Sequence, residues 1–468
     1  MLKKLSAVEI VALLFIGAVL IGQLLVSPVL GLANNGDFER IMVWGGIKLP
    51  DVVTGDAKYF GFFNRVYEIV RTRPGSYISS TSLFLKVAVW INQVFHSTTS
   101  FDIRFLGGLH ILALLAGVWL IVSGMRKRNV WLAWLTAALL ALVTTDKGFT
   151  LYFNSMFSEA TTFVMVLALI GCALHLTSES EQPQRWALVG ATVAGVLFVT
   201  AKVQNAVLGF LIVLWLLRFL RLYADRVWKK AVLIAAAVVL VFTAGLSGYN
   251  AFDRINIYQT VFYGVLKDSP DPAADLRELG IREDYAKLAN TDYFVPHPID
   301  LNSAEFKRDY YDKISRGKVV LFYAKHLDRF WDKLKVCAKS SFNLHYYLGN
   351  YENTGEHKAL EQSQTWTQWT EFVSRVLPKS LWFLIAFCVA FAGGSIWEWR
   401  RAASLRGKLL VEFFLVIEVM AMAQYVLPIL GDGEADLGKH LFLFNLLGSV
   451  MLVTSMIWLV RRFLYGRK

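Results

Sequence analysis

Long apolar segments alternate with short polar segments along most of the chain. The first apolar run covers residues 8–32, and about 20 apolar residues are enough for a helix to cross a bilayer. We expect this run and nine later ones to form membrane-spanning helices. The later runs cover residues 103–123, 131–145, 160–175, 186–200, 206–220, 231–249, 381–396, 409–430 and 441–460. The pattern predicts an all-α polytopic membrane protein with about ten transmembrane helices.

The segment after the first apolar run, residues 33–100, has a mixed composition. Glycines and Pro50 interrupt it, but residues 59–71 and residues 80–95 show the apolar periodicity of a helix. We expect these two stretches to form amphipathic helices that lie at the membrane interface, with their aromatic residues at the depth of the lipid headgroups.

A second polar segment, residues 251–378, contains no run long enough to span a membrane. At about 130 residues it is long enough to bury a core of its own, and it predicts an extracytoplasmic, mostly helical domain. The chain therefore divides into three parts. Residues 1–250 form an N-terminal transmembrane module with seven helices and the first outer loop at 33–100, residues 251–378 form the domain, and residues 379–468 carry the last three helices.

Composition and charge support this class. With 56% hydrophobic residues, 15 Trp and 33 Phe, the chain is more apolar than a soluble domain of this size. The net charge of +12 gathers in short clusters between the apolar runs, which is typical of membrane orientation and argues against a nucleic-acid partner. The clusters are Lys3-Lys4, residues 125–128, residues 218–230, Arg400-Arg401 and residues 461–468. They predict a multi-pass protein with both termini in the cytoplasm.

The polar residues next to the predicted helices gather on the outer side of the membrane. Asp37 follows the first helix, Glu159 precedes the fourth, and residues 201–205 form a polar break that we expect to face protein rather than lipid. Residues 432–440, rich in charged side chains, link the ninth and tenth helices. A transporter would place charges near the bilayer midplane and on both sides, and we expect no charge deep in these helices. One outer layer of charges favours an enzyme that acts on the headgroup of a lipid-linked substrate.

This set of residues suits the transfer of a sugar from a lipid phosphate. Such a transfer passes through an oxocarbenium-like state, and the acceptor hydroxyl needs a carboxylate base. The phosphate leaving group needs positive charge or a metal. We select Asp37 as the candidate base, with Glu159 assisting it or binding the acceptor. The candidates for holding the phosphate are Lys202, His440 and Arg329.

Each candidate also has a structural explanation. Asp37 can belong to a turn that caps the next helix, and Glu159 can stabilise the first turn of the fourth helix through the helix dipole. Lys202 can extend to the membrane interface, as lysines near helix ends do, and His440 can be a packed histidine with satisfied hydrogen bonds.

The link between the ninth and tenth helices carries three carboxylates in a short stretch. Asp432, Glu434 and Asp436 form either a solvated loop or a site for a hard divalent cation such as Mg, Mn or Ca. The sequence predicts no other cofactor.

Short motifs in the outer segments resemble those of a known family. They are Asn34-Asn35-Gly36-Asp37-Phe38, Tyr152-Phe153-Asn154-Ser155, Lys202-Val203-Gln204, Lys439-His440-Leu441 and the segment from Tyr258 to Gly280. They look like motifs of the WsfD-type hexose or rhamnose transferases of bacterial surface-glycan assembly. More broadly, the chain resembles the GT-C superfamily of membrane glycosyltransferases, which carry a catalytic acid soon after the first helix and use polyprenyl-phosphate-sugar donors. The resemblance extends from the first outer loop to the last helix.

The resemblance implies an inverting transferase of the bacterial inner membrane with its active site facing outside. Its partners would be a polyprenyl-phosphate-linked sugar donor, a glycan acceptor and membrane lipids. Asp37 maps onto the catalytic acid of the first loop, and Glu159 onto the acidic position of the second outer loop. Further candidates for binding the substrate or its phosphate are Asn35, Arg40, Tyr152, Asn154 and Gln204.

Other functions share this topology. A flippase or exporter of lipid-linked glycans would need charges deep in the helices and a cavity open to both sides. A polymerase or ligase of surface polysaccharide would join whole repeat units with similar outer groups, and a scaffold for such machinery would use the outer domain for docking. The outer domain has no Trp-Trp-Asp motif, so we do not expect transfer to protein asparagine.

Overall fold

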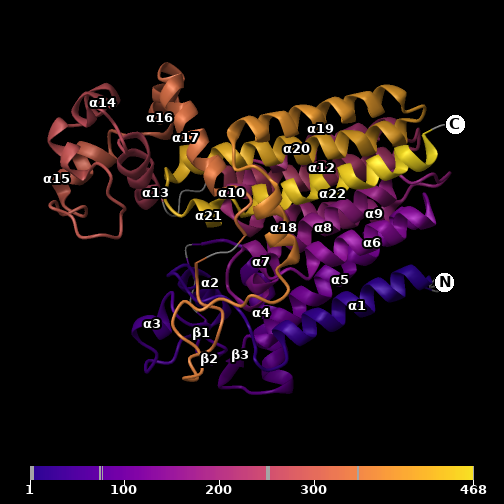
Figure 1. The fold of residues 1–468 in the computed structure, drawn as a ribbon, viewed down its shortest axis with the longest axis horizontal. Helices are drawn as coiled ribbons and strands as arrows, with labels where there is room; N and C mark the ends of the chain where they lie inside the picture. The colour runs from indigo at the N-terminus through magenta and orange to yellow at the C-terminus, as the bar shows by residue number, and fades with distance from the viewer. Residues whose placement is uncertain (1–4, 73–74, 76, 249–252, 345–346, 467–468) are drawn as a thin grey trace.

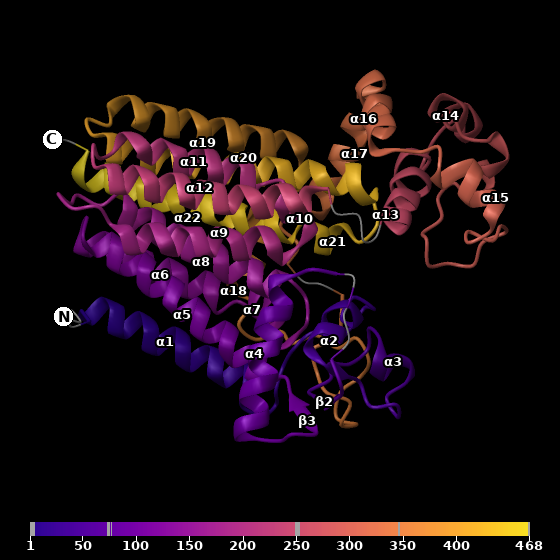
Figure 2. The same cartoon turned by 180° about the vertical axis from the view of Figure 1, so that it is seen from behind.

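The structure is a computed structural model that describes residues 5–466 apart from residues 73–74, 76, 249–252 and 345–346. Within these residues, eight helical runs are long and apolar enough to cross a membrane. They are α1 (Ala7–Leu24), α5 (Arg104–Arg126), α8 (Glu159–Leu176), the run of α10 (Val203–Ala206), α11 (Gly209–Arg218) and η2 (Phe219–Arg221), α12 (Arg226–Ser247), α19 (Leu381–Arg401), α20 (Leu405–Asp432) and α22 (Phe442–Tyr465). Figure 1 shows them as one bundle with both termini at the same end. We call this the terminal end, and the opposite end, which carries the extramembrane segments, the domain end (Figure 2).

The predicted fold class is confirmed, and the described residues contain eight spans, or nine if one bent pair is counted, where we expect about ten. The run at 131–145 forms α6 (Val130–Thr144), which is a ninth span only if it is joined to Lys147–Asn154 across a bend of 61°. This second piece consists of α7 (Lys147–Thr150) and η1 (Leu151–Asn154). The run at 186–200 forms α9 (Arg185–Ala201), whose 17 residues fall short of spanning length. The first helix ends at Leu24, because Pro28 has no N–H group with which to continue it.

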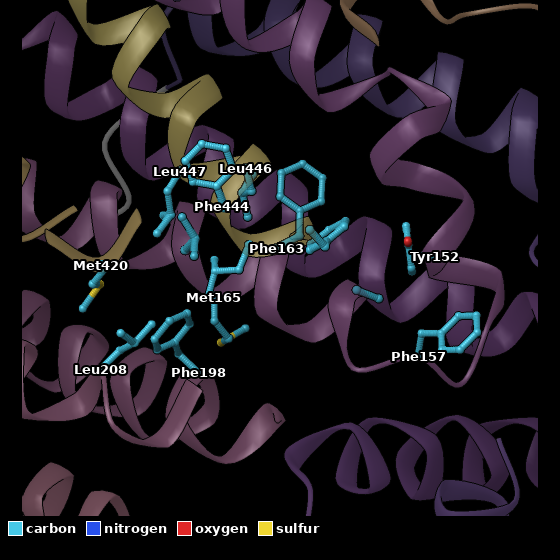
Figure 3. Packing of buried hydrophobic residues seen from close by; sticks show 14 of the residues in the cluster. Tyr152, Phe157, Phe163, Met165, Phe198, Leu208, Met420, Phe444, Leu446 and Leu447 are labelled. Atoms are coloured by element: carbon cyan, nitrogen blue, oxygen red, sulfur yellow. The ribbon is translucent and has the colours of Figure 1, made fainter. Parts of the chain in front are cut away.

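Helix α8 lies at the centre of the bundle. Of the residues in its apolar stretch, 94% are buried. The helix packs most extensively against α5 and α9. The approach to α5 is close, because a Cβ atom at Gly171 would lie only 2.3 Å from Cβ of Leu120. Small residues at such crossings let membrane helices pack by direct backbone contact. Figure 3 shows Phe163 and Met165 of α8 among buried side chains that come from other helices.

Residues 33–103 form the first of two extramembrane lobes. This lobe contains α2 (Glu39–Gly45), β1 (Ile47–Lys48), α3 (Gly55–Lys58), β2 (Val66–Ile69), α4 (Ser80–Phe95) and β3 (Ser100–Asp102). The strands form an antiparallel sheet in the order β1-β2-β3, with Tyr67 opposite Phe101. The helix predicted at 80–95 is confirmed as α4. The helix predicted at 59–71 is wrong, because β-branched and aromatic residues in this segment pair with β3 and bury Tyr67.

Residues 253–340 form the second lobe, whose regular structure is helical. Its elements are α13 (Asp253–Thr260), the π-helix η3 (Val261–Val265), α14 (Pro272–Leu279), η4 (Glu283–Leu288), α15 (Ala304–Phe306), the π-helix η5 (Lys307–Tyr311), α16 (Arg316–Lys325) and α17 (Leu327–Ser340). The rings of Phe262, Phe306 and Tyr310 form its core, with Tyr310 centred 5.0 Å from each of the other two.

The chain then returns to the first lobe before it reaches α18 (Gln368–Val376). The N–H of Gly31 donates to the carbonyl of Asn350 at 3.2 Å, and the N–H of Ala33 donates to the carbonyl of Gly349 at 3.0 Å. The segment after the second lobe therefore packs against the first outer loop.

Gly433 fixes the link between α20 and α21 (Leu437–His440) against the second lobe. Its φ is +64° and its ψ is −133°, a combination that only glycine adopts without strain. A Cβ atom at this position would lie 2.9 Å from Cα of Gly264. The next residue, Glu434, donates its N–H to the carbonyl of Tyr263 at 3.0 Å.

We expect Gly433→Ala to lower the thermal stability of the purified protein. The strained backbone conformation costs about 1–3 kcal/mol, and the contact with Gly264 adds to this cost. Gly438→Ala is the matched control, because a Cβ atom at that position meets nothing within 4 Å. Thermal unfolding in detergent measures both variants. An unchanged melting temperature for Gly433→Ala would show that the link adapts without this close contact.

Candidate functional site

Two asparagines shape the turn that presents Asp37. The side-chain oxygen of Asn34 accepts hydrogen bonds from the N–H groups of Gly36 at 2.8 Å and Phe38 at 3.2 Å. The side-chain oxygen of Asn35 accepts one from the N–H of Asp37 at 3.2 Å. Gly36 has a φ of +102°, which favours glycine. The predicted candidate Asn35 therefore positions the backbone of Asp37.

Two cations hold the carboxylate of Asp37. Nη2 of Arg40, in the first turn of α2, lies 2.8 Å from Oδ2 of Asp37. Lys439 of α21 forms an ion pair with the same oxygen. Lys439 is buried, and its Nζ lies 4.3 Å from the centre of the Phe157 ring. The first outer loop is therefore tied to the link between the last two spanning helices.

A second ion pair lies close to the first. Glu159, the first residue of α8, is 3% exposed and accepts a hydrogen bond from Nζ of Lys202 at 2.8 Å. Lys202 occupies the extended break between α9 and α10, so this polar break contacts protein, as we expect for a polar group at membrane depth. The ring of Tyr77 lies beside Arg40, with its centre 5.0 Å from the guanidinium carbon.

These ion pairs form one electrostatic unit, which we call the charged cluster: Asp37, Arg40, Glu159, Lys202 and Lys439. Lys202 also acts on Asp37, and Lys439 also acts on Glu159. Burial by itself raises the pKa of the Asp37 carboxyl, but Lys439 and Arg40 outweigh burial and hold this pKa well below its usual range. Glu39 also acts on Arg40, and the cluster itself places three cations beside two carboxylates. The cluster therefore suits a substrate that carries a phosphate.

Of the two predicted candidates in the second outer loop, Tyr152 borders the cluster and Asn154 does not. The ring of Tyr152 is centred 5.8 Å from Phe157 and 4.8 Å from Phe442. The side-chain amide of Asn154 donates to the carbonyls of Leu24 at 2.7 Å and Leu30 at 2.8 Å. Asn154 therefore fastens the end of α1 and has a structural role.

Gln204 and His440 brace the segment that carries Lys439. Nε2 of Gln204 donates to Oε1 of Gln424 at 2.6 Å and to the carbonyl of His440 at 3.4 Å. Nε2 of His440 lies 2.8 Å from Oδ2 of Asp432. Both predicted candidates thus contact α20, and they stabilise α21 beside the cluster.

Arg329 serves the second lobe. Its guanidinium donates to Oδ2 of Asp275 at 2.6 Å and to the carbonyl of Val265. These contacts hold α17 against α14 and η3. In the part of the chain that the structure describes, Arg329 has no contact with the charged cluster.

The three carboxylates of the α20–α21 link have separate surroundings. Glu434 pairs with Lys333 at 2.5 Å and with Lys267 at 2.9 Å, whereas Asp432 contacts His440. Asp436 is the residue before α21 and has a φ of +48°. Among the described residues, no group of three or more His, Cys, Asp or Glu side chains is placed to hold a metal ion.

The prediction of site residues missed Lys439 and Tyr77. Lys439 stands directly before a spanning helix in the predicted outer layer, opposite in charge to Asp37, and this placement is the signal that would have identified it. Tyr77 lies in a segment without regular structure. No sequence signal separates it from the other aromatic residues of the first lobe.

One carboxylate lies deep in the bundle. Glu418 is near the middle of α20 and only 4% exposed, and within the described residues it makes no hydrogen bond or ion pair. The expectation that no charge lies deep in the helices is therefore wrong. Carboxylates at this depth are rare and costly, but Glu418 does not belong to the charged cluster.

The helix bundle, the two lobes and the charged cluster define a multi-pass membrane protein with a polar site at the domain end. Residues 1–468 match the model of a family described as the YfdI N-terminal transmembrane domain. The chain therefore belongs to this family. No curated protein and no solved structure matches it.

We expect Asp37 and Lys439 to be energetically coupled in thermal unfolding. Asp37→Asn leaves the buried Lys439 without the carboxylate it pairs with, and Lys439→Gln leaves Asp37 with Arg40 as its remaining cation, so both changes are destabilising. The double variant should be more stable than the sum of the two single effects, by about 0.5–3 kcal/mol. The exposed pair Lys48 and Asp51, 2.9 Å apart, is the control, and the same substitutions there should show no measurable coupling. Additive effects of the Asp37 and Lys439 substitutions would contradict the ion pair.

Proposed function

We propose that this protein is an inverting glycosyltransferase that transfers a sugar from a polyprenyl-phosphate donor to a glycan acceptor at the domain end. The observation that carries the proposal is the charged cluster, in which a carboxylate lies among cations that suit a lipid phosphate at the end of a membrane bundle. The resemblance of the outer motifs to GT-C glycosyltransferases supports the same reaction. In this proposal the domain end faces the outside of the bacterial inner membrane, because the basic clusters gather towards the terminal end.

In the proposed step, the oxygen of an acceptor hydroxyl attacks the anomeric carbon of the donor sugar. The bond from that carbon to the phosphate oxygen breaks, and polyprenyl phosphate leaves with the electron pair. Asp37 accepts the proton of the hydroxyl as a general base. Attack on the side opposite to the leaving group inverts the configuration. Lys439, Arg40 and Lys202 compensate the charge on the phosphate.

Donor binding has a direct effect on the base in this proposal. Without a donor, Lys439 and Arg40 lower the pKa of Asp37, and a carboxyl with a low pKa is a weak base. A donor phosphate attracts the same two cations and weakens their hold on the carboxylate. The pKa of Asp37 then rises towards the value that burial favours, so the base is stronger when a donor is bound.

Glu159 is proposed to bind the acceptor or to assist Asp37. Its pairing with Lys202 keeps a cation of the α9–α10 break next to the base. Glu159 is also the first residue of α8, where the helix dipole stabilises its negative charge. Glu159 therefore contributes to the cluster in either role.

We expect Asp37→Asn to remove most of the transfer activity. Asn keeps the size and polarity of the side chain but cannot accept the proton, so the rate should fall by a factor on the order of 10² or more. The assay uses the purified full chain in nanodiscs with a panel of polyprenyl-phosphate hexoses, and it measures the release of polyprenyl phosphate. Asp51→Asn, at an exposed carboxylate of the same lobe, is the matched control and should keep the parent rate.

The same assay separates the alternatives. Equal turnover by the parent and Asp37→Asn would reduce Asp37 to a turn residue. Binding of lipid-linked glycan without transfer by either protein would favour a flippase or exporter. Transfer restricted to whole repeat units would favour a polymerase or ligase.

We expect Lys439→Gln to move the acid limb of the pH profile to higher pH. In the parent, the pKa of Asp37 is lowered, so the carboxylate stays ionised and kcat/KM should not fall as the pH drops from about 7 to about 5. Without Lys439, burial is opposed by fewer cations and the pKa rises. Because kcat/KM reports the free enzyme, it should begin to fall at higher pH in the variant. Lys86→Gln, at an exposed lysine of α4, is the control, and identical profiles for all three proteins would contradict the effect of Lys439.

A further inference from the structure

A cavity of about 700 Å³ runs along the helices of the bundle. Its walls are formed by α5, α6, α8, α19, α20 and α22. The lining residues recur every three or four positions and so share one face of each helix, as Leu446, Val450 and Val453 do on α22. On α22 the lining extends from Leu446 to Arg461, a distance of about 22 Å along the helix axis. Only 11% of the residues in the apolar stretch of α19 are buried. The cavity therefore borders lipid beside this helix. It is a long groove within the membrane.

The charged residues of this groove are confined to its terminal end. Arg128 and Arg461 line that end, and neither forms an ion pair within the described part of the chain. The two arginines are close enough that burial and the charge of Arg461 together lower the pKa of Arg128, against the attraction of Glu179. The lining carboxylate, Glu398, pairs with Arg462 and accepts a hydrogen bond from Trp458 at 2.7 Å, and Arg461 also acts on it. Arg128, Arg461 and Arg462 outnumber the two carboxylates that act on them, Glu179 and Glu398, so the opening carries a net positive charge.

Aromatic side chains close the groove at its domain end. Phe163 lines the groove, and its ring is centred 5.3 Å from Phe149, which lies 5.8 Å from Phe442. Phe442 in turn contacts Tyr152 at the border of the charged cluster. These rings are buried, and Figure 3 shows Phe163 and Tyr152 in this region. They separate the apolar groove from the polar site.

We propose that this groove binds a long-chain polyprenyl phosphate, with its phosphate between Arg128 and Arg461 and its hydrocarbon chain along the groove towards the domain end. Charge complementarity supports an anionic headgroup at the terminal end. The length of the groove supports a long chain, because each leaflet contributes only about 15 Å of hydrocarbon, and the groove continues beyond that depth. The site is distinct from the charged cluster, and it does not depend on the proposed transfer reaction.

The test is native mass spectrometry of the full chain in detergent, with undecaprenyl phosphate as the probe. Undecaprenol, which lacks the phosphate, and phosphatidylglycerol, whose chains are short, are the comparison lipids. We expect undecaprenyl phosphate to bind more tightly than either. The double substitution Arg128→Gln with Arg461→Gln should weaken its binding by a factor on the order of ten or more. Lys229→Gln, at an exposed lysine at the start of α12, is the control for charge.

Two glycines of α19 provide a control for shape. Gly394 lines the groove and Gly393 does not, and a Cβ atom at either position meets nothing within 4 Å. Gly394→Leu should therefore obstruct the hydrocarbon chain, while Gly393→Leu should leave binding unchanged. This pair keeps the test valid if the double arginine variant fails to fold, since Arg128 also donates to the carbonyl of Leu174 at 3.2 Å.

Each measurement is repeated with Lys439→Gln, which removes a cation of the charged cluster. Lipid that still binds to this variant is assigned to the groove, and lipid that is lost is assigned to the charged cluster. Loss of binding in the arginine variants and in Gly394→Leu, with retention in both controls, supports the groove as a lipid site. Equal binding of phosphatidylglycerol or undecaprenol would overturn the proposal, and so would equal losses in the control variants. Because no transfer is measured, these outcomes leave the proposed enzymatic function unaffected.

Discussion

Compensation of charge at the end of the membrane bundle is the constraint on which this structure depends. Glu159 and Lys439 are almost completely buried, and a buried charge without a partner costs several kcal/mol. Their partners are Lys202 of the α9–α10 break and Asp37 of the first lobe, which are far apart from them in the sequence. Each of these segments is therefore held in place by the charges of the others, and a polar site results where apolar helices end.

The surrounding structure maintains this arrangement. Gly433 allows the link after α20 to pass close to the second lobe. Gln204 of α10 donates to Gln424 of α20 and to the carbonyl of His440 of α21, and so holds these helices together. Arg329 stabilises the second lobe from within. Some residues of this region thus carry the charges of the site, and others hold the segments that present those charges.

The bundle also separates two environments along its length. At the domain end, polar groups are concentrated in the charged cluster. Below the aromatic side chains of Phe149, Phe163 and Phe442, the groove is apolar as far as the arginines at the terminal end. In the two proposals, cations hold a lipid phosphate at either end of the bundle and the groove takes a hydrocarbon chain, because a charged headgroup needs cations and a chain needs an apolar surface.

The sequence by itself determined the class of the protein, the position of most spanning helices and the sidedness of its polar residues, because hydrophobic length and the placement of basic residues report directly on a bilayer. It also indicated Asp37, Glu159, Arg40 and Lys202, which the structure brings into one cluster. Only the tertiary structure decided that Lys439 completes this cluster, that residues 66–69 form a strand and that Glu418 lies deep in α20. Ion pairs and strand pairings join residues distant in the chain, so their partners depend on how the helices and lobes pack and not on any local pattern.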